Sequence, residues 1–201
     1  MKVIFSLFFI NLFLLVSLFS QNEIHLLGGK ILTGEIQSIH GDSIIFKLSK
    51  KNKPIVLETS RVYSVLDKDK KETVLYKQDS TIGNYYTVEE MRMHVYGKQD
   101  AWKGVRPKVL PALTFLVSSI GGFLIGDSFV VLAVPFATYL GSLLFSGPVV
   151  FVNTVRDPAF LESQPYLDGY ATVSKTKKNS RALLGSISGT IVGVSAFQLT
   201  K

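Results

Sequence analysis

The residues able to carry out nucleophilic or metal chemistry are few in this chain, and their spacing matches no reactive site. Cysteine is absent, which excludes thiolate nucleophiles and thiolate-bound zinc. A serine hydrolase places its nucleophile at the centre of a Gly-x-Ser-x-Gly turn, whereas residues 185–189 read Gly-Ser-Ile-Ser-Gly within an apolar run. His25, His40 and His94 are far apart in the sequence and lack the short spacing typical of metal ligands.

Phosphate-binding loops and acid–base pairs are also missing from the sequence. It contains no Gly-x4-Gly-Lys-Ser/Thr loop, no Gly-x-Gly-x-x-Gly and no His-Glu-x-x-His. Asp67 and Asp69 stand in a predicted turn, and Glu89-Glu90 stands at a predicted helix start, where acidic side chains have local structural roles. We therefore expect no enzymatic activity, no catalytic residue, no metal and no cofactor.

The charged residues are concentrated in the first half of the 201-residue chain. Residues 21–108 hold 15 of the 22 Lys and Arg and 11 of the 15 Asp and Glu, whereas residues 109–201 hold 6 and 4. Three runs in the second half, 109–126, 128–155 and 182–200, contain no Asp, Glu, Lys, Arg or His. Each run is close to or above the roughly 20 residues that cross a bilayer as a helix. The sequence therefore predicts a polar domain followed by a membrane region.

Residues 1–20 have the pattern of a secretory signal peptide. Lys2 supplies a positive start, residues 3–19 are apolar with three polar interruptions, and Leu18-Phe19-Ser20 is an acceptable cleavage sequence. The alternative is an uncleaved anchor helix. In both cases the following domain is exported, which predicts a location in a bacterial cell envelope, with the polar domain in the periplasm and the choice of inner or outer membrane open.

Residues 22–78 alternate apolar and polar positions in five or six short runs, a pattern typical of half-buried antiparallel strands. Gly28-Gly29 and His40-Gly41-Asp42 predict tight turns, and Gly34 predicts a bend within a strand. Because so small a sheet would leave both edges open, we expect closure into a barrel. The layout of residues 24–34 resembles the first hairpin of SH3-like or Sm-like barrels, which implies a binding module without naming its ligand.

An amphipathic linker helix is predicted over residues 87–104. Thr87-Val88-Glu89-Glu90 matches a capping box at its start, and Gly97 weakens its middle. Its apolar face is predicted to hold Val88, Met91, Val95 and Trp102, and its polar face Arg92, Lys98 and Asp100.

Two groups of basic residues precede apolar runs. They are Lys98, Lys103, Arg106 and Lys108 before the first run, and Lys175, Lys177, Lys178 and Arg181 before the last. We interpret these eight residues as a basic collar that meets lipid phosphates. An ordinary solvated linker is the alternative for the first group.

The membrane region is predicted to consist of a helical hairpin and a C-terminal helix. The hairpin covers 109–152 and reverses near Asp127, a polar connection covers 153–181, and the last membrane helix covers 182–200. The complete fold class is therefore α+β, with a small antiparallel barrel, an amphipathic helix and a helical membrane region.

Small residues recur four positions apart in this region. They are Gly122 and Gly126 in the hairpin, and Gly185, Gly189 and Gly193 in the last helix. Such spacing places glycines on one helix face and lets backbones approach closely in lipid. We interpret these glycines as helix-packing sites within the chain; self-association and chance spacing are the alternatives.

The charges conflict with simple export. If the first two membrane segments each cross once, both groups of the basic collar lie outside, against the usual cytoplasmic bias of Lys and Arg. The conflict has three solutions: shallow insertion of the hairpin and the last helix, inverted insertion of residues 3–19, or an outer membrane as the host. We favour export, because Lys2 and the amino terminus outweigh the nearly neutral flank after the apolar run.

The order of these elements is similar to that of a group of Bacteroidota-type cell-envelope proteins with no assigned activity. Its motifs here are Met-His-Val-Tyr-Gly-Lys-Gln-Asp-Ala-Trp-Lys-Gly from Met93 to Gly104, and Tyr-Leu-Asp-Gly-Tyr from Tyr166 to Tyr170. The resemblance covers nearly the whole mature chain and implies architecture and location only.

The leading hypothesis is a non-enzymatic, membrane-anchored envelope protein whose exported barrel is an interaction module. Its predicted partners are the lipid bilayer and either an envelope protein or a second copy of the chain. The alternative is a glycine-packed helical oligomer that forms a pore or a transport accessory. Nucleic-acid binding, suggested by the sequence pI of about 9.5 and by the barrel type, is disfavoured by export and by basic residues that cluster at membrane flanks rather than among aromatic residues.

Overall fold

A computed structural model describes residues 21–49, 53–145, 147 and 149–201. The predicted signal peptide, residues 1–20, lies outside this part of the chain. The fold divides into two units, Met1–Val95 and Tyr96–Lys201, and the division falls inside one helix.

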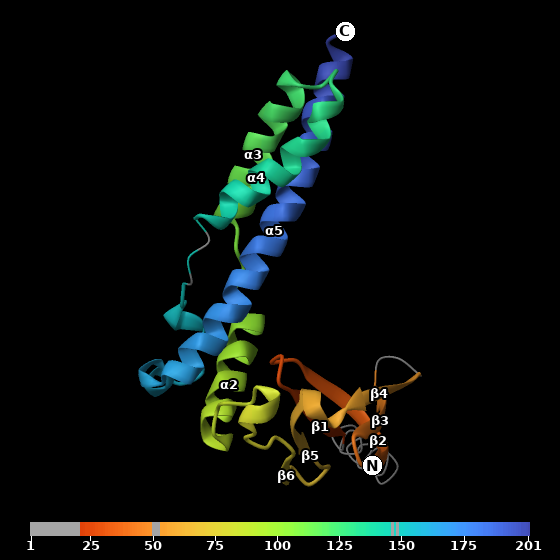
Figure 1. Ribbon diagram of the computed structural model, residues 1–201, viewed down its shortest axis with the longest axis vertical. Coiled ribbons are helices and arrows are strands. Elements are labelled where there is room, and N and C mark those ends of the chain that lie inside the picture. Colours follow the sequence, from red (N-terminus) through yellow and green to blue (C-terminus); the bar gives the residue numbers. More distant parts are fainter. Residues whose placement is uncertain (1–20, 50–52, 146, 148) are drawn as a thin grey trace, which may run out of the picture. The chain divides into compact units, whose positions relative to one another are not determined.

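The first unit contains a six-stranded antiparallel sheet (Figure 1). Its strands are β1 (Asn22–Leu26), β2 (Ile31–His40), β3 (Ser43–Leu48), β4 (Pro54–Glu58), β5 (Val62–Leu66) and β6 (Glu72–Val74). They lie in the order β4-β3-β2-β1-β5-β6. The predicted α+β class and the antiparallel strands are confirmed. Among the described residues no pairing joins the edge strands β4 and β6, so the sheet is open and closure into a barrel is not shown.

Strand β2 is irregular near the position where Gly34 predicted a bend. A Cβ built on Gly34 would overlap the backbone carbonyl oxygen of Lys47 and would lie 2.9 Å from Cζ of Phe46, so any other residue would force β2 and β3 apart. The pairing of β2 with β3 shifts register between Ile36 and Ser38, a bulge that increases the local twist. Gly34 thus allows β2 and β3 to approach closely beside this bulge.

The apolar positions that alternate along the strands form the core of the sheet. Ile24, Ile44 and Phe46 are fully buried, and Val62 and Val65 complete the cluster. Burial of one large apolar side chain contributes about 1.5–3 kcal/mol, so this cluster contributes several kcal/mol to the stability of the first unit.

Tyr63 follows Val62 in β5 and faces the opposite side of the sheet, because successive side chains of a strand alternate between the two faces. Tyr63 is fully buried and packs with Tyr76, Met91 and Val95, which brings the start of α2 (Val88–Gly104) against the sheet. The Tyr63 hydroxyl accepts a hydrogen bond of 3.1 Å from Nε of Arg92. The predicted apolar face of the helix is therefore correct in its first half.

The capping box that was predicted at the start of α2 is present. The Thr87 amide donates to Oε2 of Glu90 at 2.8 Å, and the Glu90 amide donates to Oγ1 of Thr87 at 3.3 Å. The hydrogen bond from the Thr87 amide lowers the pKa of the Glu90 carboxyl.

The second unit is helical. After α2 it contains α3 (Val109–Leu124), α4 (Val134–Leu143) and α5 (Gln164–Leu199), with short 3-10 turns at Phe129–Ala133, Val152–Thr154 and Pro158–Glu162. Helices α3 and α4 lie beside the second half of α5, and the end of α2 lies beside its first half (Figure 1).

Two predicted boundaries differ from the structure. Residues 164–181, expected to be a polar connection, are the first half of α5, because polar side chains here line a helix that packs on α2. The second arm of the hairpin predicted over 109–152 is short, since α4 ends at Leu143, just before the Gly147-Pro148 pair. The helix predicted over 182–200 is the second half of α5.

Only α5 is long and apolar enough by itself to cross a membrane, among the helices of the described segments. Helices α2 and α3 pass the same test together, but they are bent by 58° at the break between them. With 16 residues, α3 falls short of the roughly 20 expected from the uninterrupted run.

Candidate functional site

The second half of α5 packs on α3 through glycines. Cβ atoms built on Gly185, Gly189 and Gly193 would lie within 3 Å of Oγ1 of Thr114, the carbonyl carbon of Phe115 and the amide nitrogen of Phe123, respectively. These three positions therefore require glycine, because any side chain would push α3 away. The close approach is the geometry that the glycine spacing predicted.

Gly122 in α3 and Gly126 in the turn after it also face α5. A Cβ on Gly122 would lie 2.7 Å from the carbonyl oxygen of Thr190, and one on Gly126 would lie 2.6 Å from Cδ1 of Phe197. All five glycines identified from the sequence thus lie at contacts within one chain.

The interior of this helical group is unusually polar. Thr114, Ser118, Ser142, Ser186 and Thr190 are buried between the helices. Oγ1 of Thr114 donates to the carbonyl of Ala182 in α5 at 3.0 Å, and Oγ1 of Thr190 donates within its own helix to Ser186 at 3.0 Å. Small and hydroxylic side chains therefore fill the space that large apolar side chains occupy in a water-soluble core.

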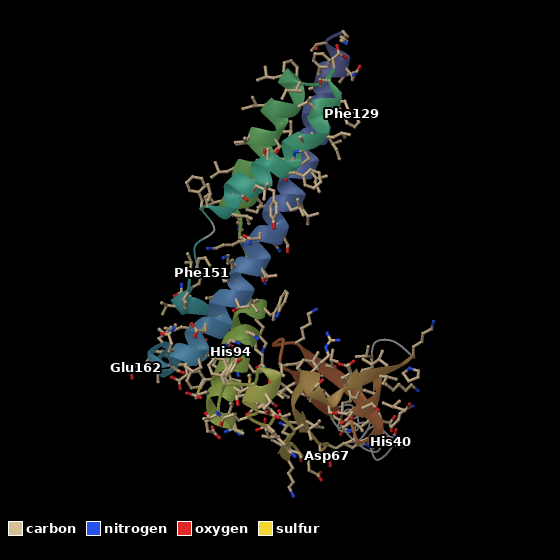
Figure 2. The ribbon with its side chains drawn as sticks, viewed as in Figure 1. His40, Asp67, His94, Phe129, Phe151 and Glu162 are labelled. Carbon is tan, nitrogen blue, oxygen red and sulfur yellow. The ribbon has the colours of Figure 1, made fainter. Side chains whose placement is uncertain are left out.

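The outer face of the same helices is apolar. Large apolar side chains project outward from α3, α4 and the second half of α5 (Figure 2). The exposed fraction reaches 86% at Phe129, 84% at Leu144 and 88% at Leu199. Other exposed members are Leu113, Leu116, Val117, Ile120, Leu132, Phe136, Leu140, Leu184, Ile191 and Val192. An apolar surface this extensive marks an interaction with lipid or with another protein.

Charges stand at both ends of this apolar region. Arg181 directly precedes it on α5 and donates to the carbonyl of Pro107, just before α3, at 3.4 Å. At the other end Lys201 forms an ion pair with Asp127, in the turn after α3. The apolar region is therefore bounded by Arg181 at one end and by the ion pair of Lys201 with Asp127 at the other.

Two lysines of the second group of the basic collar donate to backbone carbonyls of other segments of the second unit. Nζ of Lys177 donates to the carbonyl of Trp102 at 2.8 Å and lies 5.6 Å from the centre of its ring. A lysine on α5 thus satisfies a carbonyl at the end of α2, where a positive charge is favourable. Nζ of Lys178 donates to the carbonyl of Gly147 at 2.8 Å.

The remaining members of the collar differ in exposure. Lys103, Arg106, Lys108 and Lys175 are exposed to solvent, whereas Lys98 is half-buried and burial lowers the pKa of its ammonium group. Desolvation lowers the pKa of Lys98 because the charged form loses hydration. Lys98 is therefore less suited than the exposed residues to meet a lipid phosphate.

An ion pair that sequence reasoning missed joins the buried carboxylate of Asp100 to Arg156, whose side chain is partly exposed. Asp100, expected on a polar outer face, is 4% exposed. Its Oδ1 accepts from Nε of Arg156 at 2.9 Å, and its Oδ2 accepts from the hydroxyl of Tyr166 at 2.8 Å. The Arg156 guanidinium also donates to Oε1 of Gln99 at 2.9 Å and lies 4.4 Å from the centre of the Tyr96 ring. The prediction for Asp100 was wrong because its partners come from a distant segment.

The two sequence motifs around residues 93–104 and 166–170 are the two sides of this contact. A Cβ on Gly97 would lie 2.9 Å from the amide nitrogen of Tyr170, so Gly97 allows α2 and α5 to touch. The glycine predicted to weaken α2 instead marks its closest approach to α5. The signal available in the sequence was that each motif holds a polar side chain able to bond to the other, Asp100 in the first and Tyr166 in the second.

The residues considered for catalysis are scattered. His25 lies on β1, His40 ends β2 and His94 lies on α2, and the labelled His40 and His94 are well separated (Figure 2). Oγ of Ser186 donates to the carbonyl of Leu183, and Oγ of Ser188 donates to the carbonyl of Leu184, both at hydrogen-bond distance within α5. The described residues contain no group of three or more His, Asp and Glu side chains that could hold a metal ion.

No family model, no curated protein and no solved structure matches this chain.

Proposed function

We propose that this chain is a non-enzymatic protein of a bacterial cell envelope, anchored in a membrane by α3, α4 and the second half of α5. The observation that carries the proposal is the inverted distribution of polarity in these helices, with hydroxyls and glycines inside and large apolar side chains outside. A helix in the core of a soluble protein is mostly buried, whereas 28% of the apolar window of α5 is buried.

The dimensions of the apolar region support this role. The 18 residues from 182 to 199 rise about 27 Å in an α-helix, close to the roughly 30 Å of a hydrocarbon core. Charged residues stand at the ends of this length and are absent from its outer face in the described residues. Helix α3 and the shorter α4 cover the side of α5 that carries the glycines.

The sheet of the first unit is proposed to be the interaction module, carried on the exported side and closed into an SH3-like or Sm-like barrel. The bulge in β2 and the glycine contact beneath Phe46 favour a strongly twisted sheet. A hollow of about 420 Å³ on this unit is lined by polar residues, among them Asp42 and Lys77, and by apolar ones such as Leu75 and Ile82. Such a mixed surface suits a segment of another envelope protein that carries both polar and apolar side chains.

The pore alternative has less support from the geometry. Its sequence argument was that the glycine faces join separate chains, but Gly185, Gly189 and Gly193 lie against α3 of the same chain. A glycine face that is already covered offers little surface to a second copy.

Membrane fractionation tests the proposal. We expect the full-length protein to stay in the membrane pellet after carbonate extraction and to float with vesicles, and to need detergent for release. The variant Ile191→Lys, on the exposed side of α5, should weaken retention, because a charge at the centre of a membrane helix costs about 2.5–3.5 kcal/mol. Val56→Lys, at an exposed apolar residue of the sheet, is the matched control and should leave retention unchanged.

Protease access to the sheet in intact spheroplasts tests the exported side. We expect cleavage from outside, together with removal of residues 1–20 on N-terminal sequencing. A full-length protein that is soluble after lysis without detergent would disprove the anchor, and a sheet protected in spheroplasts but cleaved after lysis would disprove export.

A further inference from the structure

A groove open to the surface runs between α3 and α4. Its volume is about 540 Å³, within the range of about 300–1,000 Å³ that small-molecule sites occupy. The lining is mainly apolar and comes from Leu110, Leu113 and Val117 on α3, from Ala137 on α4 and from Phe145 after it. The groove lies wholly within the second unit.

Two hydroxyls along the groove are already used by the backbone. The hydroxyl of Thr114 lies within donating distance of the carbonyls of Pro111 and Ala182, and Oγ of Ser142 donates to the carbonyl of Tyr139 at 2.7 Å. The third hydroxyl in the lining is that of Thr138, and the rest of the groove offers a mainly hydrocarbon surface to an occupant.

Two basic side chains hold the chain segments at one end of the groove. Nζ of Lys178 donates to the carbonyl of Gly147, two residues after Phe145, and Nη1 of Arg181 donates to the carbonyl of Pro107, three residues before Leu110. Exposed Lys108 lies between Pro107 and Leu110. A ligand that fits both features has a long hydrocarbon chain and an anionic head.

We propose that the groove binds one acyl chain of an anionic phospholipid whose phosphate lies against Lys178 and Arg181. The inference rests on the proposed membrane anchor and adds a specific lipid site to it. Charge complementarity selects the anionic lipid, since each Lys or Arg near a membrane surface contributes about 1 kcal/mol of attraction to anionic headgroups.

Gly141 allows the groove to be filled without disturbing the helices. It lines the groove, and a Cβ built on it meets no atom within 4 Å. Gly141→Leu therefore places a side chain in the groove, and Gly141→Ala is the matched control that leaves most of the space open.

The test uses the purified full-length protein in detergent, titrated with phosphatidylglycerol or with phosphatidylcholine of the same acyl chains, and native mass spectrometry. We expect one tightly retained phosphatidylglycerol per chain. Gly141→Leu should weaken its retention about tenfold or more, since displacement of only two methylenes costs about that factor, and Gly141→Ala should retain it. Unchanged retention in Gly141→Leu would overturn the proposal, as would a dimer that this variant converts to monomers without loss of lipid.

The headgroup contact is tested separately. Lys178→Gln with Arg181→Gln should reduce the preference for phosphatidylglycerol over phosphatidylcholine by about fivefold for each charge removed. Lys178→Arg, which keeps the charge, should retain the preference. Equal binding of both lipids by the unchanged protein would overturn the anionic site.

The result is distinguishable from failure of the anchor itself. If the protein leaves the membrane on carbonate extraction, the proposed function fails and the lipid site fails with it. If the protein stays in the membrane while Gly141→Leu keeps its lipid, only the lipid site fails.

Discussion

The hydroxyl of Tyr166 donates a 2.8 Å hydrogen bond to Oδ2 of Asp100, 66 positions earlier in the chain. Both side chains are buried, and Arg156 donates to the same carboxylate from its backbone amide and from Nε. One carboxylate thus joins the end of α2, the segment before α5 and α5 itself. This junction lies outside the part of α5, residues 182–199, that we propose to lie in lipid.

Removal of the Tyr166 hydroxyl should destabilise the second unit. Tyr166→Phe keeps the ring but leaves a buried carboxylate oxygen short of one donor, and such a loss costs about 1–3 kcal/mol. Thermal unfolding of the full-length protein in detergent measures the effect. The matched control is Tyr85→Phe, at a tyrosine that is 74% exposed, and equal melting temperatures for the two variants would show that the hydrogen bond has no stabilising role.

The same hydroxyl predicts a loss of stability at alkaline pH. Burial raises the pKa of the Tyr166 phenol, and the hydrogen bond to Asp100 and the negative charge of that carboxylate raise it further. Above the ordinary tyrosine pKa of about 10, the unfolded chain loses a proton that the folded chain keeps. The contribution of Tyr166 to the free energy of unfolding should therefore be constant below about pH 10 and fall above it.

The comparison with Tyr166→Phe isolates this contribution, because burial also raises the pKa values of Tyr63 and Tyr76. We expect the alkaline decrease in stability to be steeper in the unchanged protein than in Tyr166→Phe. Parallel pH profiles from denaturant unfolding in detergent would contradict this assignment.

The sheet could be predicted closely because its signals are local. The alternation around Ile44 and Phe46 and the turn glycines Gly29 and Gly41 each act within a few residues. The capping box at Thr87 is equally local. The shape of the sheet could not be predicted, because closure depends on whether β4 and β6 meet, and no short pattern encodes that distance.

The sequence could predict that these glycines form close helix contacts, but not which helix they contact. Spacing of four residues shows that Gly185, Gly189 and Gly193 share a helix face, whereas the surface they meet depends on the reversal between α3 and α5. The ion pair of Asp100 with Arg156 was not predictable, because the two residues are 56 positions apart and neither stands in a motif that implies the other.

Bulk at Gly189 should separate α3 from α5. A Cβ there would lie 2.9 Å from the carbonyl carbon of Phe115, and a backbone neighbour cannot rotate away. Gly189→Leu should therefore lower stability by about 1–3 kcal/mol or more, measured by thermal unfolding in detergent. Gly141→Leu, where the space is open, is the matched control and should unfold near the temperature of the unchanged protein.

The oligomeric state of Gly189→Leu separates the two glycine hypotheses. If the glycines pack within one chain, the variant is destabilised at every protein concentration. A variant that unfolds normally but loses a detergent-resistant oligomer would instead support the pore alternative.

The capping box at the start of α2 predicts a pH effect of opposite direction. The hydrogen bond from the Thr87 amide lowers the pKa of the Glu90 carboxyl, so the folded chain releases this proton more readily than the unfolded chain. The contribution of the cap is therefore present above the ordinary glutamate pKa of about 4.3 and is lost as the pH falls through the lowered folded value. Hydrogen exchange of the amides of Glu89, Glu90 and Met91, corrected for intrinsic rates, should show protection that decreases at acid pH. In Glu90→Gln, whose amide oxygen still accepts but does not titrate, this decrease should disappear, and its persistence would assign the acid sensitivity to another group.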